Sequence, residues 1–165
     1  MVNKKAQEEI VGFVLIVVIM AVILLIILGV SLRSDKNIQK ESKEISQFLE
    51  STMEYTSDCA INYEPDYAKI GDLIEKCYSK AKCSSGKNTC DVLRETLNDI
   101  LDSSWKVGPD RPIKGYLFNA TYETNLTHEN IVILSKGECK GSYKGAEYLS
   151  PAYPGTIVSS FNLCY

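Results

Sequence analysis

The chain has 165 residues, of which 45% are hydrophobic and 24% are charged. This composition excludes a disordered polymer, and the length allows one modest domain. Eighteen Lys and Arg stand against 21 Asp and Glu, a net charge of -3, and no basic stripe is present. Nucleic acid is therefore not an expected partner, because its phosphates are bound by clustered cations.

The hydrophobic residues are concentrated in one run near the N-terminus. Ile10 to Val30 is 21 residues long and contains no charge, and only Gly12 and Gly29 fall outside the hydrophobic class. A helix of that length is about 31 Å long, close to the roughly 30 Å of hydrocarbon in a bilayer. A small domain could not bury a helix that is apolar on every face. The run therefore predicts a single transmembrane helix in contact with membrane lipid.

The orientation of this span is decided by the residues on its C-terminal side, because basic residues flank it at both ends. Lys4 and Lys5 precede the run, and Arg33 and Lys36 come after it. All six cysteines and both Asn-x-Thr glycosylation acceptors come after the run, and an oxidising exterior suits them. We expect a single-pass cell-membrane protein with residues 31–165 outside the cell.

The residues just before the span are Lys4-Lys5-Ala6-Gln7-Glu8-Glu9. A cleaved secretory signal would have a shorter apolar run followed by small residues, and this chain has neither. The basic leader charges Lys4 and Lys5 hold the N-terminus in the cytoplasm. Glu8 and Glu9 suit a first helical turn, where the macrodipole favours negative charge. Taken alone, these residues are also compatible with an uncleaved signal anchor.

This junction resembles the class III, prepilin-type signal of archaeal type IV pilin-like proteins. The resemblance implies that a prepilin-type peptidase cuts between Ala6 and Gln7, leaving Gln7 as the mature N-terminus. It also implies that the apolar helix stays attached and packs with other pilin-like subunits in a filament core.

Helical periodicity continues beyond the span. Residues 34–57 contain neither Pro nor Gly, and apolar or small side chains recur at helical spacing. They are Ile45, Phe48, Leu49, Thr52, Met53 and Thr56. The pattern predicts that one long helix extends to about Ser57, with residues 34–44 as a solvated neck. A flexible stalk is the alternative for this segment.

Two further helices are expected before the period changes. An amphipathic pattern covers residues 66–82, a turn cluster comes next at residues 83–88, and Thr89 can cap the third helix. The core-facing positions of this third helix are Val92, Leu93, Thr96, Leu97, Ile100 and Leu101. These two helices are expected to form a hairpin.

Beyond Gly108-Pro109 the period changes from 3.6 to 2. Tyr116, Phe118, Ala120 and Tyr122 alternate with Leu117, Asn119, Thr121 and Glu123, which predicts a strand with a polar outer face. Three more strands are expected at residues 130–135, 142–149 and 156–165, with a loop at residues 150–155. They would form an antiparallel sheet.

The expected fold class is α+β, and four regions succeed one another along the chain. They are a cytoplasmic leader (1–6), a transmembrane helix (7–33), a helix extension and neck (34–57) and an extracellular head (58–165). A long N-terminal helix, an intervening α region and a C-terminal antiparallel sheet is also the general layout of type IV pilins.

The six cysteines predict a disulfide framework. Four of them, Cys59, Cys77, Cys83 and Cys90, lie in the helical half, and Cys139 and Cys164 lie in the sheet half. Pairing within each half joins Cys139 to Cys164 and leaves three ways to join the others. A zinc site is the competing interpretation of the four helical cysteines, although no C-x-x-C pair is present.

The polar residues point to modification more than to catalysis. Asn119 and Asn125 open the two glycosylation sequons, and we expect both to be reachable on a polar surface. His128, the single histidine, is expected in a polar loop, and carboxylates such as Glu75 and Glu95 stand singly on helix faces. No enzyme motif, cofactor or metal site is therefore expected. The remaining possibility for catalysis is a pair of Asp or Glu residues that only the folded chain brings together.

Tyrosines crowd the C-terminal quarter of the chain, at Tyr143, Tyr148, Tyr153 and Tyr165. Such residues usually pack a sheet, but an exposed cluster could bind a glycan or a neighbouring subunit.

These observations indicate two functions. The first is a pilin-like structural subunit of a surface filament, assembled through its apolar helix. The second is an anchored ectodomain that does not polymerise and has a binding role.

Overall fold

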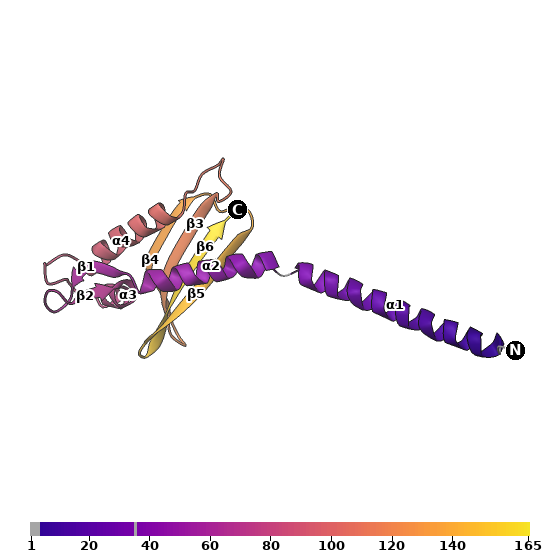
Figure 1. Ribbon diagram of the computed structural model, residues 1–165. Coiled ribbons are helices and arrows are strands. Elements are labelled where there is room, and N and C mark those ends of the chain that lie inside the picture. The colour runs from indigo at the N-terminus through magenta and orange to yellow at the C-terminus, as the bar shows by residue number, and fades with distance from the viewer. Residues whose placement is uncertain (1–3, 35) are drawn as a thin grey trace. The chain divides into compact units, whose positions relative to one another are not determined.

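The computed structural model describes the backbone of residues 4–34 and 36–165, and the side chains of residues 12–29 and 43–165. The chain divides into two compact units, residues 1–40 and residues 41–165. The first holds helix α1 (Lys4–Ser34) and the start of helix α2 (Lys36–Met53). The second, called the head below, holds the rest of α2 and every later element (Figure 1).

Helix α2 ends earlier than the sequence predicts. Ile45, Leu49 and Met53 are buried along one face of it, as expected from their spacing. Thr56, however, lies in strand β1 (Thr56–Ala60) and not on the helix. Strand β1 pairs with strand β2 (Tyr67–Lys69) in a small antiparallel sheet that the sequence pattern does not predict. The expected helix to residue 57 is therefore wrong at its C-terminal end, because residues 56–60 satisfy their backbone groups in a sheet instead.

The next expected helix is also shorter than residues 66–82. Its first residues form β2, and helix α3 (Ile70–Tyr78) begins directly afterwards. Ser57 donates a hydrogen bond of 2.8 Å to the carbonyl of Ala68, which ties this stretch to β1. Lys80 then adopts a positive φ of 56°, a left-handed conformation that is typical just beyond a helix end.

Helix α4 (Thr89–Ser104) is capped by Asn88, not by Thr89 as predicted. The side chain of Asn88 accepts a hydrogen bond of 2.8 Å from the amide of Cys90. Thr89 is fully buried, and its hydroxyl donates to the carbonyl of Ala81 at 2.9 Å. Both residue types cap helices well, so local propensity could not separate the two. The hairpin arrangement of α3 and α4 stays a prediction.

The predicted antiparallel sheet is confirmed. Its strands are β3 (Gly115–Glu123), β4 (His128–Gly137), β5 (Tyr143–Ala152) and β6 (Gly155–Cys164), in the order β4-β3-β6-β5 with every neighbouring pair antiparallel. The expected loop at residues 150–155 is mostly strand, because Pro151 pairs with Thr156 and Ala152 pairs with Gly155. A proline is tolerated there because β5 is an edge strand.

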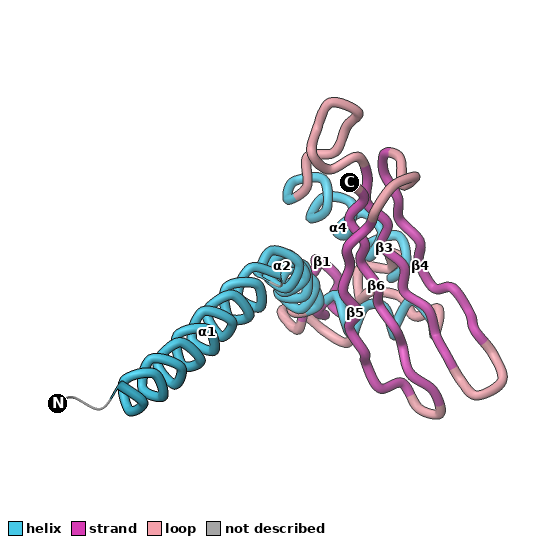
Figure 2. Tube along the Cα trace, turned by 90° about the vertical axis from the view of Figure 1, so that its right-hand side faces the viewer, coloured by secondary structure: helices cyan, strands magenta, loops and turns pink. Residues whose placement is uncertain are grey.

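The alternation predicted for β3 is confirmed by burial. Tyr116, Phe118, Ala120 and Tyr122 are all at most 6% exposed. Figure 2 shows α2 and α4 on the same side of the four strands, and their apolar side chains cover this inner face. The ring of Phe48 on α2 lies 5.4 Å from those of both Phe161 on β6 and Trp105. The opposite face of the sheet carries the alternate residues.

Candidate membrane anchor and modification sites

The apolar run forms the central part of α1. The window Gly12–Gly29 is helical and has a mean hydropathy of 3.3, and none of it is buried. Within the described residues it is the one helix whose length and composition allow it to cross a membrane. It is therefore a candidate membrane anchor, and a signal sequence near an N-terminus has the same properties.

The residues predicted to be processed lie at the start of the same helix. The backbone of α1 begins at Lys4. The side chains of Lys4, Lys5, Ala6, Gln7, Glu8 and Glu9 lie outside the described residues, so cleavage between Ala6 and Gln7 stays a prediction.

All six cysteines lie in three pairs at disulfide-bonding distance. Cys139 is joined to Cys164, the pair expected from the sequence, with 5.1 Å between their Cα atoms. The other pairs are Cys59 with Cys83, at 5.2 Å, and Cys77 with Cys90, at 4.6 Å. Among the three connectivities that the sequence left open in the helical half, the fold selects this one.

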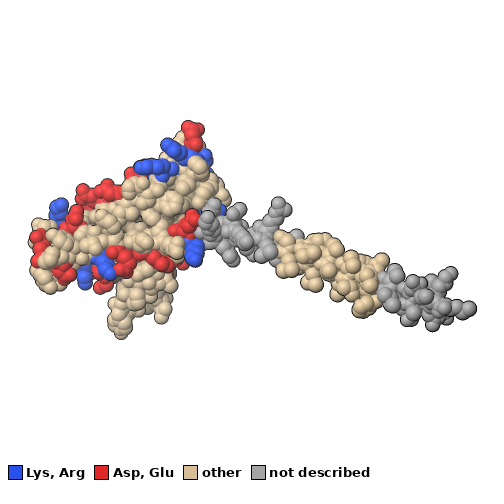
Figure 3. Space-filling view, in the orientation of Figure 1, with Lys and Arg blue, Asp and Glu red and all other residues tan. Residues whose placement is uncertain are grey.

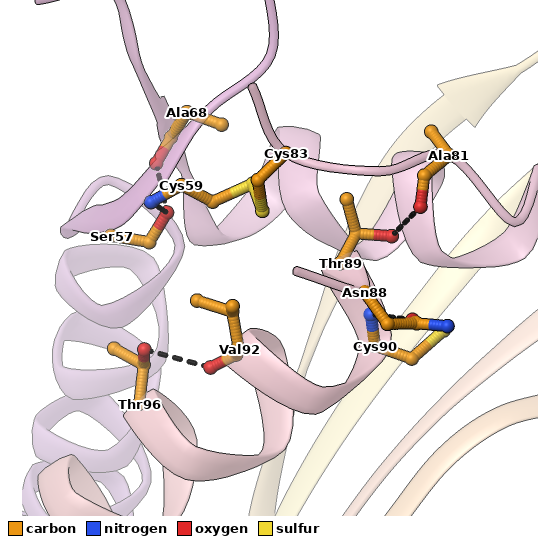
Figure 4. Close-up of a disulfide and its surroundings, with 10 residues drawn as sticks. All are labelled: Ser57, Cys59, Ala68, Ala81, Cys83, Asn88, Thr89, Cys90, Val92 and Thr96. Carbon is orange, nitrogen blue, oxygen red and sulfur yellow. Dashed lines mark hydrogen bonds between the residues drawn. A yellow bond between two sulfur atoms is a disulfide. The ribbon is translucent and has the colours of Figure 1, made fainter. Parts of the chain in front are cut away.

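The two helical pairs hold the turn between α3 and α4 from both sides. Cys59 comes from β1 and meets Cys83 in that turn, whereas Cys77 on α3 meets Cys90 in the first turn of α4. Figure 4 shows the first pair together with the hydrogen bonds of Ser57, Asn88 and Thr89 around it. The pairs therefore tie β1 to the turn and α3 to the start of α4.

The two sequons lie in different surroundings. Asn125 is exposed in the turn between β3 and β4, where the hydroxyl of Thr124 accepts hydrogen bonds from the amides of Leu126 and Thr127 at 3.2 and 3.0 Å. Asn119 lies on the polar face of β3 beside Thr121, as the alternation predicts. It is only half-exposed, its Nδ2 donates to Thr121 Oγ1 at 3.2 Å, and its Oδ1 is buried without a partner.

This difference predicts which site a glycosyl transferase reaches on the folded head. We expect transfer to Asn125 and none to Asn119, because β3 is paired on both sides and Asn119 has its amide engaged. Intact-mass and peptide analysis after incubation with an oligosaccharyl transferase would measure the occupancy. Thr127→Val should abolish the modification, and the matched change Thr121→Val should leave it unchanged. Unfolded, reduced chain should accept at both sites, and modification of Asn119 on folded protein would contradict the prediction.

A polar contact that no sequence motif indicates ties α4 to the sheet. Asp102 near the end of α4 accepts hydrogen bonds from Tyr116 Oη at 2.7 Å and from Lys136 Nζ at 2.6 Å. Both hydrogen bonds lower the pKa of the Asp102 carboxyl, and the bond from Lys136 has the larger effect. Burial, together with the carboxylate, raises the pKa of Tyr116. Tyr116 and Lys136 are 14 and 34 positions away from Asp102, so no local spacing could reveal the contact.

The lowered pKa gives the stability of the head a pH dependence of known sign. A carboxyl with a lower pKa in the folded state contributes stability above its unfolded pKa of 3.8 and loses it as the pH falls through the folded value. Asp102→Asn should therefore flatten the fall in stability below about pH 4, as measured by denaturant unfolding at several pH values. An exposed control, Asp91→Asn, should keep the wild-type slope. Equal slopes for all three proteins would contradict this role for Asp102.

The other polar residues singled out in the sequence do not lie together in one site of the described structure. His128 lies at the first position of β4, not in a loop, with its Nδ1 3.4 Å from Glu123 and 71% of its side chain exposed. Asp58, Glu95 and Asp99 line one open hollow of about 200 Å³, which sequence spacing did not predict. Within the part of the chain that the structure describes, no three His, Cys, Asp or Glu residues are placed to hold a metal ion.

A comparison of the chain with protein-family models, with curated proteins and with solved structures finds no match.

Proposed function

We propose that this chain is a pilin-like structural subunit of a surface filament, anchored and assembled through α1. The observation that carries the proposal is the difference between the two units in how their apolar residues are buried. Gly12–Gly29 is apolar throughout and has no buried residue. The head, by contrast, buries its own aromatic core and has all of its cysteines paired.

The physical reason for assembly through α1 lies in its composition. When such helices leave lipid they must cover one another to stay out of water. The charged heads gain less from meeting, so they would be displayed outside the cell on a bundle of apolar helices. The basic leader before Gln7 supports the proposal further, since its removal would release the helix for packing.

The competing function is an anchored ectodomain that does not polymerise, and it would use the same span. Cleavage distinguishes the two. Ala6→Phe should block a prepilin-type peptidase while leaving membrane insertion intact, and Val2→Phe serves as the control because it makes a similar change four residues before the junction. We expect full-length Ala6→Phe protein in the membrane fraction and none in filaments sheared from the cells. If Ala6→Phe reaches the surface and functions like the wild type, the anchored ectodomain takes the place of the pilin.

A further inference from the structure

The face of the four-stranded sheet opposite the core has no covering element in the head. We call it the outer face. Because side chains alternate along a strand and the register is known, its members can be assigned on each strand. They include Ile133 and Ser135 on β4, and Leu117, Asn119 and Thr121 on β3. On the other two strands they include Val158, Ser160 and Asn162 on β6, and Tyr143, Glu147 and Leu149 on β5.

The outer face carries fewer charged residues than the rest of the head. Residues 41–165 carry 13 Lys and Arg and 18 Asp and Glu, a net charge of -5. Figure 3 shows many of these charges over the side of the head that carries the helices. On the outer face the strand register places two acidic residues, Glu123 and Glu147, and no Lys or Arg.

The same face exposes large apolar side chains. Ile133 on β4 is 52% exposed and Leu149 on β5 is 64% exposed. Tyr143 is 72% exposed beside a hollow of about 320 Å³ that Leu117 and Asn162 also line. These apolar side chains lie at separate points of a surface with few charges, and the residues between them on β3 and β6 include the polar Asn119 and Ser160.

We propose that the outer face docks onto the outer face of a second copy of this chain. Two heads with a net charge of -5 repel each other, and they can approach with the fewest opposed charges through the surface that carries the fewest. Two β sheets can pack face to face about 10 Å apart. This contact adds a head-to-head interface to the proposed function and does not depend on leader cleavage.

The size of the face suffices for such a contact. Four strands about 4.8 Å apart and nine residues long, at about 3.3 Å each, cover roughly 19 by 30 Å, or about 570 Å² per copy. Two copies together exceed the ~1,000 Å² that a specific interface needs. The centre is polar, with Asn119 Oδ1 buried and without a partner, so we expect a weak and reversible dimer.

The proposal is tested on full-length protein in a density-matched detergent. Sedimentation over tens to hundreds of micromolar should show a reversible dimer of the wild type. Ile133→Glu and Leu149→Glu place a further negative charge on the outer face on different strands, and each should weaken the dimer at least tenfold. The matched control is Leu126→Glu, at a hairpin tip where Leu126 is 93% exposed, and its dimer should be unchanged.

The remaining outcomes overturn the interface. Wild-type protein that stays monomeric over the whole range would overturn it, and so would a dimer that neither outer-face variant weakens, because its contact would then lie elsewhere than on the outer face. Equal weakening by all three variants would show a general effect of charge. Near-UV circular dichroism checks that each variant is folded. Since none of these results involves the leader, a failure here leaves the proposed filament role intact.

Discussion

Phe161→Ala should lower the free energy of unfolding of the head by about 3–5 kcal/mol, the usual cost of deleting a buried aromatic ring. Phe161 is 0% exposed and lies at the centre of the core. Its ring centroid is 5.4 Å from that of Phe48, 6.0 Å from that of Trp105 and 6.1 Å from that of Tyr116. The change therefore leaves a cavity between α2 and the sheet, at a point where three other aromatic rings would lose a partner.

Tyr153→Ala is the control for this change, because it also removes an aromatic ring but from a turn position that is 101% exposed. Its effect should stay within about 0.5 kcal/mol. Urea unfolding of both variants measures the difference. A loss of less than about 1 kcal/mol in Phe161→Ala would show that α2 is not packed on β6 as described.

Reduction of the three cysteine pairs should unfold the head. The pairs close loops with sequence separations of 13, 24 and 25 residues. By restricting the unfolded chain, each contributes about 3 kcal/mol. Their joint loss of roughly 9 kcal/mol is comparable to the whole stability of a typical domain, about 5–15 kcal/mol.

Circular dichroism with and without a reductant monitors this transition, and non-reducing peptide mapping gives the linkages. We expect Cys59–Cys83, Cys77–Cys90 and Cys139–Cys164, with no remaining thiol. A head that keeps its near-UV signal after complete reduction would contradict the expected contribution. Stoichiometric zinc with four titratable thiols would show that the helical cysteines bind metal instead.

The parts of the fold that depend on a regular repeat could be predicted from the sequence. The apolar run of α1 and the alternation of Tyr116 with Leu117 and of Phe118 with Asn119 are examples. The helix boundaries were less accessible. Thr56 and residues 66–69 fit a helical pattern, but pairing between β1 and β2 decides their conformation, and that pairing joins residues with no shared local signal.

In the candidate sites, too, some features could be predicted from the sequence and others depend on tertiary structure. Cys139 and Cys164 could be paired from the sequence because they are the two cysteines of the sheet half. Choosing between the partners of Cys59 required the turn that brings Cys83 back to β1. Asn119 and Asn125 are equivalent as sequons, and only the position of Asn119 on a central strand separates them. Asp102, Tyr116 and Lys136 meet through tertiary structure alone.

The mature N-terminus tests the central proposal most directly. Protein purified from the membrane of the native cells, or from filaments sheared from their surface, should be analysed by mass spectrometry of its N-terminal peptide. A chain that begins at Gln7 and keeps the apolar helix is the result we predict. A chain that keeps Met1 or Val2 at its N-terminus, or a soluble product that begins near Ser31, would contradict the pilin-like role.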